Sequence, residues 1–258
     1  MEMKGSVIIV TGASQGIGRE IAHALAKESA MVVFAARSID KLRLEASKAG
    51  SNAIAVQMDV SNDQSIEKAI REIMDRYGRI DAVINNAGFN GSLSLWSDTN
   101  SSQTRQIFDT HVYGTERVMR AIVPIMRKQK SGVIVNFASI VAWVPMPGAA
   151  AYSAAKAAIV SLSETLREEL REFGIAVRVF SPAHTNTGFA LERPTRATPQ
   201  SVAQDFVEFL HGEQACATTE GLLLFMKRIF PRMTANIMNQ TGFKALAAER
   251  ARAEKCRK

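Results

Sequence analysis

Short runs of apolar residues alternate along this chain with longer segments in which apolar residues recur every three or four positions. Most of the runs are rich in Val and Ile, which is typical of strands covered on both faces. The predicted strands are Ser6–Val10, Met31–Ala36, Ala53–Gln57, Ala82–Asn85, Gly132–Phe137 and Ala176–Ser181. The predicted helices are Gly16–Lys27, Asp40–Ala49, Asp63–Tyr77, Ser102–Lys128 and Tyr152–Phe173. Strand and helix alternate throughout, which predicts an α/β fold with a doubly wound parallel sheet and helices on both faces.

Two helix starts carry capping signals. Ser61 and Gln64 form a predicted capping box, and Thr198-Pro199 predicts an N-cap followed by proline in the first turn of a later helix. The sequence shows no internal linker and no repeat beyond the strand–helix unit. We therefore expect a single domain over residues 1–220, with a covering loop near 186–199, and a basic helical C-terminal extension over 221–258.

Composition places the chain among ordinary globular proteins. It has 258 residues, of which 47% are hydrophobic and 22% are charged. Its two cysteines, Cys216 and Cys256, make no disulfide framework and fit a reducing compartment. The N-terminus lacks the pattern of a signal peptide, and no apolar run reaches the roughly 18 residues of a membrane span. We expect a cytoplasmic protein, and the scattered histidines and cysteines predict no metal site.

Positive charge is concentrated at the C-terminal end. Lys227–Lys258 contains nine basic and two acidic residues, which accounts for the whole formal net charge of +7. Apolar residues recur between these charges: Leu222, Phe225, Met226, Ile229, Phe230, Met233 and Ile237. The pattern fits a helix on an anionic membrane surface, and it also fits an extension packed on the domain or on a partner subunit. Few aromatic residues interleave the charges, so we expect no nucleic-acid partner.

A glycine-rich turn follows the first predicted strand. Gly12 permits a tight turn, and Gly16 and Gly18 remove side chains where a pyrophosphate and a helix must approach each other. The helix that begins there offers free N–H groups to an anion. A plain turn is the alternative, but the position after the first strand favours a Rossmann-like nucleotide site. The expected contact residues are Gly12, Ser14, Gln15, Gly16, Ile17 and Gly18.

The end of the second strand bears on cofactor choice. A carboxylate at this place would hold the ribose diol of NAD, whereas this chain has Ala36-Arg37. Arg37 can form paired hydrogen bonds with a 2′-phosphate. The sequence therefore favours NADP(H) over NAD(H), with a solvated surface arginine as the alternative.

Tyr152 and Lys156 lie four residues apart on one predicted helix, downstream of Ser139. A phenol normally ionises near pH ~10, so it exchanges protons at neutral pH only if its anion is stabilised. A lysine at i+4 lies on the same helix face and can stabilise that anion by charge. The Ser139 hydroxyl can hold a substrate oxygen beside the phenol. Each residue alone fits a structural role, but together they predict a site that moves a proton on or off an alcohol oxygen.

These residues resemble the short-chain dehydrogenase/reductase family over roughly Lys4 to Thr187. The resemblance rests on the order of its motifs: Thr11–Gly18, Asp59-Val60, Asn85-Asn86-Ala87-Gly88, Ser139 and Tyr152-x-x-x-Lys156. It implies that Asp59 and Val60 lie at the adenine ring and that Asn86, Ala87 and Gly88 line the cofactor cleft.

The resemblance also implies further roles. Lys156 would bond the nicotinamide ribose hydroxyls, while Tyr152 would lie against the same cofactor. Pro182 and Thr187 would belong to the segment that covers the nicotinamide, and Asn85 would help to hold the central strand. Proteins of this kind commonly pair through their long helices, so we expect a homodimer or homotetramer.

Two positions depart from the family pattern, and one of them, Ala183 in place of the glycine that commonly follows Pro182, concerns only the path of the covering loop. The family usually has Asn where this chain has His111, followed three residues later by Gly114. That Asn helps to hold a water molecule linked to the catalytic lysine. Histidine can also bond water, and with an ordinary pKa near ~6.5 it could alter the pH profile. We include His111 among the candidate catalytic residues, with a tolerated replacement as the alternative.

The resulting hypothesis is reversible hydride transfer between NADP(H) and a carbonyl or secondary alcohol, with Tyr152 as general acid or base. Residues expected around the substrate are Ser139, Tyr152 and an apolar set: Phe89, Val141, Trp143, Val144, Pro145, Met146 and Phe189. This lining suggests a lipophilic or aromatic substrate. The alternative is a regulatory or scaffold protein that binds NADP(H) without catalysis.

Overall fold

The computed structural model describes most of the chain. Its described residues are 2–89, 91, 93–182, 197–212, 214, 216–218, 233–234, 237, 239–244 and 247. Thr187, Phe189 and most of the predicted covering loop lie outside these residues, as does the predicted domain boundary at 220. The same holds for five apolar positions of the tail, namely Leu222, Phe225, Met226, Ile229 and Phe230.

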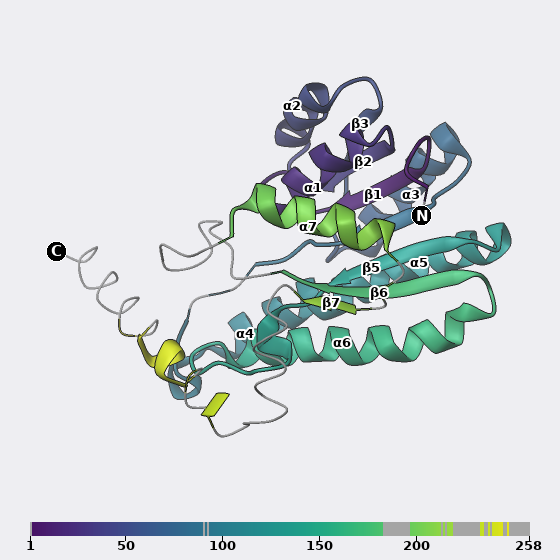
Figure 1. Ribbon diagram of the computed structural model, residues 1–258. Coiled ribbons are helices and arrows are strands. Elements are labelled where there is room, and N and C mark those ends of the chain that lie inside the picture. The colour runs from purple at the N-terminus through teal and green to yellow at the C-terminus, as the bar shows by residue number, and fades with distance from the viewer. Residues whose placement is uncertain are drawn as a thin grey trace.

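A parallel sheet of seven strands forms the centre of the protein (Figure 1). The strands are β1 (Val7–Thr11), β2 (Met31–Ala36), β3 (Ala53–Gln57), β4 (Ala82–Asn85), β5 (Gly132–Phe137), β6 (Ile175–Ser181) and β7 (Cys216–Thr218). Their order is β3-β2-β1-β4-β5-β6-β7, so the strand order reverses between β1 and β4. This reversal is the point at which an open α/β sheet places its ligand site.

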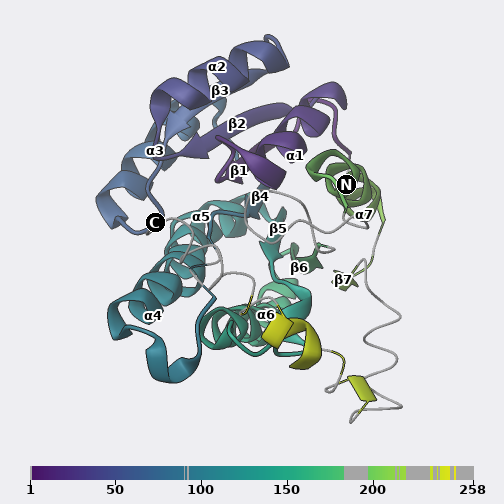
Figure 2. The same ribbon diagram turned by 90° about the vertical axis from the view of Figure 1, so that its left-hand side faces the viewer.

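Helices cover both faces of the sheet (Figure 2). One layer consists of α1 (Gly16–Lys27), α2 (Ile39–Ala49) and α7 (Pro199–His211). The other consists of α3 (Asp63–Tyr77), α4 (Ser101–Phe108), α5 (Gly114–Gln129) and α6 (Ala150–Arg171). Among the described residues, no helix is both long enough and apolar enough to cross a membrane.

Two apolar cores lie between the sheet and these layers. Ile8 and Val10 of β1 pack in the core beneath α1, α2 and α7, while Val7 and Ile9 pack in the core beneath α3, α5 and α6. Strand side chains alternate between faces, so an unbroken apolar strand such as β1 fills both cores. The doubly wound sheet predicted from the Val/Ile runs is confirmed.

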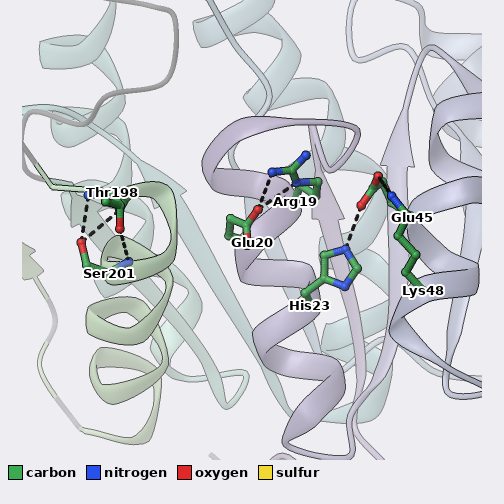
Figure 3. Close-up of polar contacts among 7 residues, drawn as sticks. All are labelled: Arg19, Glu20, His23, Glu45, Lys48, Thr198 and Ser201. Carbon is green, nitrogen blue, oxygen red and sulfur yellow. Dashed lines mark hydrogen bonds and ion pairs between the residues drawn. The ribbon is translucent and has the colours of Figure 1, made fainter. Parts of the chain in front are cut away.

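Polar contacts tie the elements of the α1 layer (Figure 3). His23 Nε2 of α1 lies 2.9 Å from Glu45 Oε2 of α2, whose other oxygen is 2.8 Å from Lys48 Nζ. At the start of α7, the Thr198 side chain accepts from the Ser201 N–H at 3.1 Å in a reciprocal capping box. The predicted N-cap at Thr198 is thus confirmed.

Two local predictions were wrong, and one strand was not foreseen. Asn62 caps α3 by accepting from the Ser65 N–H, whereas Ser61 bonds Asp59 instead. The helix predicted over Ser102–Lys128 is divided by a π-helical turn into α4 and α5. The edge strand β7 was not predicted, because its three residues, Cys-Ala-Thr, carry no Val/Ile pattern.

Candidate active site

The glycine turn after β1 packs tightly against the segment that follows β4. A Cβ at Gly18 would lie 2.3 Å from Asn86 Nδ2, and one at Gly12 would lie 2.9 Å from Ala87 Cα. Gly16 differs, because its φ is +61° and nothing lies within 4 Å of the Cβ position. Gly12 and Gly18 therefore let two loops meet, whereas Gly16 leaves its side open to a ligand.

The N-terminus of α1 keeps its backbone donors free of side-chain caps. Gln15 occupies the N-cap position without a side-chain hydrogen bond, and the first turn contains no acidic residue. By contrast, Asn62, Asn100 and Thr198 cap α3, α4 and α7 with their side chains. Free N–H groups and the positive end of the helix dipole together favour an anion at α1. The residues present therefore fit the pyrophosphate of a dinucleotide.

We call the anion site formed by the turn Thr11–Gly18 and the residues after β4 the glycine cradle. Thr11 holds its two segments together. Its hydroxyl accepts from the Asn86 and Ala87 N–H groups, both at 3.0 Å, and donates to the Ile84 carbonyl at 3.2 Å. Asn86 Nδ2 in turn donates to the Thr11 carbonyl at 3.0 Å. One buried hydroxyl thereby holds the end of β1 against the end of β4, where the predicted cofactor residues Asn86, Ala87 and Gly88 begin.

Asp59 and Arg37 lie at the far end of the cradle. Asp59 accepts from the Ser61 N–H at 3.0 Å and from the Ser61 hydroxyl at 2.6 Å. Burial alone would raise the pKa of Asp59, but these bonds and the charges of Arg37 and Arg117 hold that pKa below its ordinary value. Asp59 is therefore an acceptor at neutral pH, and Arg37 is an exposed cation near it. The neighbouring Val60 is buried.

Ser139 and Tyr152 lie together beyond β5. Ser139 starts the short 3₁₀ helix η3 (Ile140–Ala142), where its hydroxyl accepts from the Val141 N–H at 3.5 Å. Burial raises the pKa of Tyr152 to about 12, and a hydrogen bond with Ser139 acts in the opposite direction. The phenol is therefore neutral over the physiological range in this arrangement.

Lys156 is buried on the next turn of α6. Its Nζ donates to the Phe137 carbonyl at 2.6 Å and lies 5.7 Å from the centroid of the Tyr152 ring. Burial lowers the pKa of Lys156 to about 7. The sequence predicted that Lys156 would lower the pKa of the phenol, but the lowering contact here comes from Ser139. Lys156 is held by strand β5, one helical turn from Tyr152.

His111 enters this group from the π-turn. The turn spans Asp109–Tyr113, and the Gly114 N–H donates to the Asp109 carbonyl five residues earlier. The His111 ring is buried and lies edge-on to Tyr152, with the centroids 5.3 Å apart. π-Turns of this kind are frequent at functional sites. The structure thus brings all four predicted catalytic residues, Ser139, Tyr152, Lys156 and His111, into one cluster.

A buried polar chain beneath the cluster was missed at the sequence level. Asn85 Nδ2 of β4 donates to Asn136 Oδ1 of β5 at 2.8 Å, and Asn136 Nδ2 donates to Ser163 Oγ of α6 at 2.9 Å. Ser163 in turn donates to the Ile159 carbonyl at 2.6 Å. This chain links both strands to the helix that carries Tyr152. Asn136, a polar residue inside the apolar run Gly132–Phe137, was the one sequence feature that could have indicated this chain.

The predicted substrate residues occupy different surroundings. Val141 is buried, and Trp143 packs near Val160 and Val179 while its Nε1 donates to Ser181 Oγ at 3.3 Å. Phe89 packs beside α4 and α6 against Ile107, Ala151 and Ala155. From the tail, Gly242 contacts the Met146-Pro147 segment, because a Cβ there would lie 2.6 Å from the Pro147 carbonyl oxygen. Pro182 is described and half-buried at the end of β6.

Comparisons with known proteins agree with this arrangement. An uncharacterized oxidoreductase of Staphylococcus epidermidis is 35% identical over 186 residues, covering 72% of this chain and 80% of its own. A short-chain dehydrogenase structure from Streptomyces avermitilis has a TM-score of 0.79 at 29% identity and covers 89% of this chain and 94% of its own. A 3-ketoacyl-(acyl-carrier-protein) reductase from Brucella melitensis, complexed with NADH, has a TM-score of 0.76 at 27% identity, with 83% and 93% covered.

The model of the short chain dehydrogenase family matches residues 6–197, from the start of β1 to the start of α7. This span includes the glycine cradle, the π-turn and the cluster around Tyr152. The chain therefore belongs to the short-chain dehydrogenase family of nicotinamide-dependent oxidoreductases.

Proposed function

We propose that the protein is a carbonyl reductase that uses NADP(H), with Tyr152 as the proton donor to the carbonyl oxygen. The observation that supports this most is the cluster of half-buried Ser139 and Tyr152 with buried Lys156, which lies beyond β5 at the same carboxyl edge of the parallel sheet as the glycine cradle. A non-catalytic nucleotide-binding protein would have no need to hold a half-buried phenol beside a buried amine.

The proposed roles follow from the contacts. The bound nicotinamide supplies or accepts the hydride. Ser139 holds the substrate oxygen through its hydroxyl, and Tyr152 transfers the phenolic proton to that oxygen. Lys156 is fixed by the Phe137 carbonyl and would reach the nicotinamide ribose hydroxyls and the phenol through its remaining donors. The residue set Gly12, Ser14, Gln15, Gly16, Ile17 and Gly18 would hold the pyrophosphate.

The protonation state of Tyr152 suits its role as the acid of the proposed reduction. Because burial raises the pKa of Tyr152 to about 12, the side chain holds its proton at neutral pH and can act as an acid without prior activation. Oxidation of an alcohol would instead require the phenolate, which this environment disfavours. A keto substrate is therefore the better match for the described cluster.

The preference for NADP(H) rests on Arg37. It is exposed directly after β2 and is near enough to Asp59 for its charge to contribute to the lowered pKa of that carboxyl. An exposed guanidinium at this place can bind a 2′-phosphate without losing a structural partner. Asp59 and Val60 would then lie at the adenine, with Asn86, Ala87, Gly88, Pro182 and Thr187 nearer the nicotinamide.

The proposed substrate is lipophilic or aromatic. Val141 and Trp143 lie two and four residues after Ser139, and Gly242 of the tail contacts Met146-Pro147 near the same segment. Phe189 would complete the apolar lining. Steady-state oxidation of NADPH across a panel of aliphatic, aromatic and β-keto thioester carbonyls tests the proposal. Turnover by wild type that disappears in Tyr152→Phe would support it, whereas no turnover on any ketone would favour a regulatory or scaffold protein.

We further propose a cytoplasmic homodimer or homotetramer. Trp96 and Tyr113 are exposed over the α4–α5 side, with 67% and 54% of their surface accessible, and such aromatic residues are typical of subunit contacts. The alternative is peripheral membrane contact through the basic tail, where Met233, Ile237 and Phe243 are exposed apolar residues. Sedimentation velocity with and without anionic vesicles separates the two.

A further inference from the structure

The π-turn between α4 and α5 is held in place at both of its ends. Its backbone hydrogen bond runs from the Gly114 N–H to the Asp109 carbonyl five residues earlier, so the turn accommodates one residue more than a turn of α-helix. At its end, a Cβ at Gly114 would lie 2.9 Å from Val60 Cγ2 and 3.2 Å from the Val60 carbonyl oxygen. Close packing against Val60 therefore fixes the end of the turn, whereas its beginning has a different support.

Arg117 of α5 contacts Asp109, the first residue of the turn, in two places. Its Nη2 lies 2.8 Å from Asp109 Oδ1, and its Nη1 donates to the Asp109 carbonyl oxygen at 3.4 Å. That carbonyl is the same one that accepts the Gly114 N–H. Arg117 thus binds both the side chain and the backbone acceptor that characterise the π form.

The spacing of this ion pair suits a π-turn and does not suit a continuous α-helix. Asp109 and Arg117 are eight residues apart, and at about 100° per residue eight α-helical steps leave two side chains about 80° apart around the axis. The residue inserted in the π-turn makes the pair equivalent to about seven α-helical steps, which brings both side chains within about 20° of one face. Helical side chains also lean toward the N-terminus, so Arg117 extends back toward Asp109. The ion pair therefore stabilises the π form over the α form.

The other side of the guanidinium faces the segment after β3. Arg117 Nε lies 3.5 Å from Asp63 Oδ1 at the start of α3. The Asp63 side chain is 75% exposed, whereas the Asp109 side chain is 42% exposed and that of Arg117 is 24% exposed. Because water weakens an exposed ion pair, the shorter contact with Asp109 is the stronger of the two.

The shape of the turn determines where the His111 ring lies. His111 is the third residue of the turn, and its buried ring lies edge-on to Tyr152 with the centroids 5.3 Å apart. Burial, followed by the charge of Lys156, lowers the pKa of His111 to about 3, so the sequence-based idea that it titrates near pH ~6.5 is not supported. The neutral ring contacts the phenol by packing. Relaxation of the turn to an α-helix would rotate the residues before it by about 100° relative to α5 and withdraw the ring.

We propose that Arg117 is a positioning residue that selects the π form of this turn through Asp109 and thereby places the His111 ring against Tyr152. The same helix offers a matched control. Arg120, less than one turn further along α5, pairs with Glu116 of that helix and is 80% exposed. Its replacement removes a guanidinium from α5 and leaves the contact with Asp109 intact.

Histidine-selective ¹⁵N NMR of the full-length free protein tests the proposal without any turnover. The signal of His111 is the one absent from His111→Asn, among the four histidines of the chain. It should move or broaden in Arg117→Met and in Asp109→Asn, because each change breaks the ion pair at the start of the turn. It should keep its position in Arg120→Met and in Asp63→Asn, which leave that ion pair in place.

Melting temperatures show which variants fold. An unmoved His111 signal in folded Arg117→Met would overturn the proposal, and so would a signal that moves in Arg117→Met and stays in place in Asp109→Asn. If Arg117→Met does not fold, Asp109→Asn decides alone, since its side chain keeps the size of the original and loses only the charge.

A kinetic comparison rests on the proposed reductase activity. A misplacement of about 1 Å can cost up to about 100-fold in rate, so we expect kcat to fall by about tenfold in Arg117→Met and in Asp109→Asn. The double variant should lose no more than either single variant, because both changes break one shared contact. Losses that multiply in the double variant would contradict that shared contact. Inactivity of wild type on every ketone would challenge the proposed function alone and leave the NMR comparison standing.

Discussion

The cofactor cradle between β1 and β4 and the catalytic cluster between β5 and α6 are built by opposite means. The cradle depends on missing side chains and on backbone contacts, as at Gly12 and Gly18. The cluster depends on titratable side chains whose desolvation disfavours their charged forms, as at Tyr152 and Lys156. The cradle is therefore sensitive to added atoms, and the cluster is sensitive to changes in proton affinity.

The largest expected effect separates chemistry from binding at the cluster. Tyr152→Phe removes the proton donor and keeps the ring, so turnover should fall by about 10³-fold while NADPH affinity changes little. Stopped-flow or steady-state NADPH oxidation measures the first quantity, and fluorescence titration measures the second. Tyr113→Phe, at an exposed phenol on the π-turn, is the matched control and should keep wild-type turnover. Equal losses of turnover in both variants would contradict the assigned role of Tyr152.

The cradle could be read from the sequence in more detail than the cluster. Val/Ile runs fixed the first six strands, and the glycine spacing identified the turn, because both depend on local pattern. The π-turn over Asp109–Tyr113 could not be foreseen, because the sequence over Ser102–Lys128 keeps the spacing of apolar residues that is typical of one continuous helix. The neutrality of His111 and the pKa of Lys156 depend on burial by elements distant in sequence. Local patterns predict elements, whereas proton affinities emerge only from packing.

A second prediction concerns the cradle. Gly18→Ala would place its Cβ 2.3 Å from Asn86 Nδ2 and 2.7 Å from the Gly12 carbonyl oxygen. The backbone carbonyl cannot move away without opening the turn, so we expect a loss of about 1 to 3 kcal/mol in unfolding free energy and weaker NADPH binding. Gly212→Ala is the control, because its Cβ would meet nothing closer than 3.7 Å. Chemical denaturation of both variants is the measurement, and equal stability would refute the close-approach argument.

A third prediction tests the charged end of the cradle. Arg37→Ala should reduce the ratio of NADPH to NADH affinity by about tenfold, the equivalent of one charge-assisted hydrogen bond of about 1.4 kcal/mol. NADH affinity should stay near the wild-type value, because only the 2′-phosphate loses a partner. Arg43→Ala, on the exposed surface of α2, is the matched control. An unchanged ratio in Arg37→Ala would remove the basis for NADP(H) preference.

The smallest expected effect is a pH dependence of stability at Lys156. Burial lowers its pKa from 10.5 to about 7 in the folded protein, so between these values the unfolded chain binds more protons than the folded chain. Stability contributed by this site must therefore rise as pH increases from about 7 to 10.5, and at low pH the buried charge is a cost. Lys156→Met removes this dependence along with the charge.

Differential scanning calorimetry of wild type and Lys156→Met at pH 6.5 and pH 9.5 measures that difference. Only the pH-independent part of losing the bond to the Phe137 carbonyl cancels in this comparison; its pH-dependent part belongs to the lowered pKa that is being tested. Relative to the variant, wild type should gain at least about 2 °C in Tm at the higher pH. Lys41→Met, at an exposed position on α2, controls for the loss of a lysine as such. A constant difference between wild type and Lys156→Met would mean that the cluster does not disfavour the charged amine, and the contrast with the cradle would then rest on Tyr152 alone.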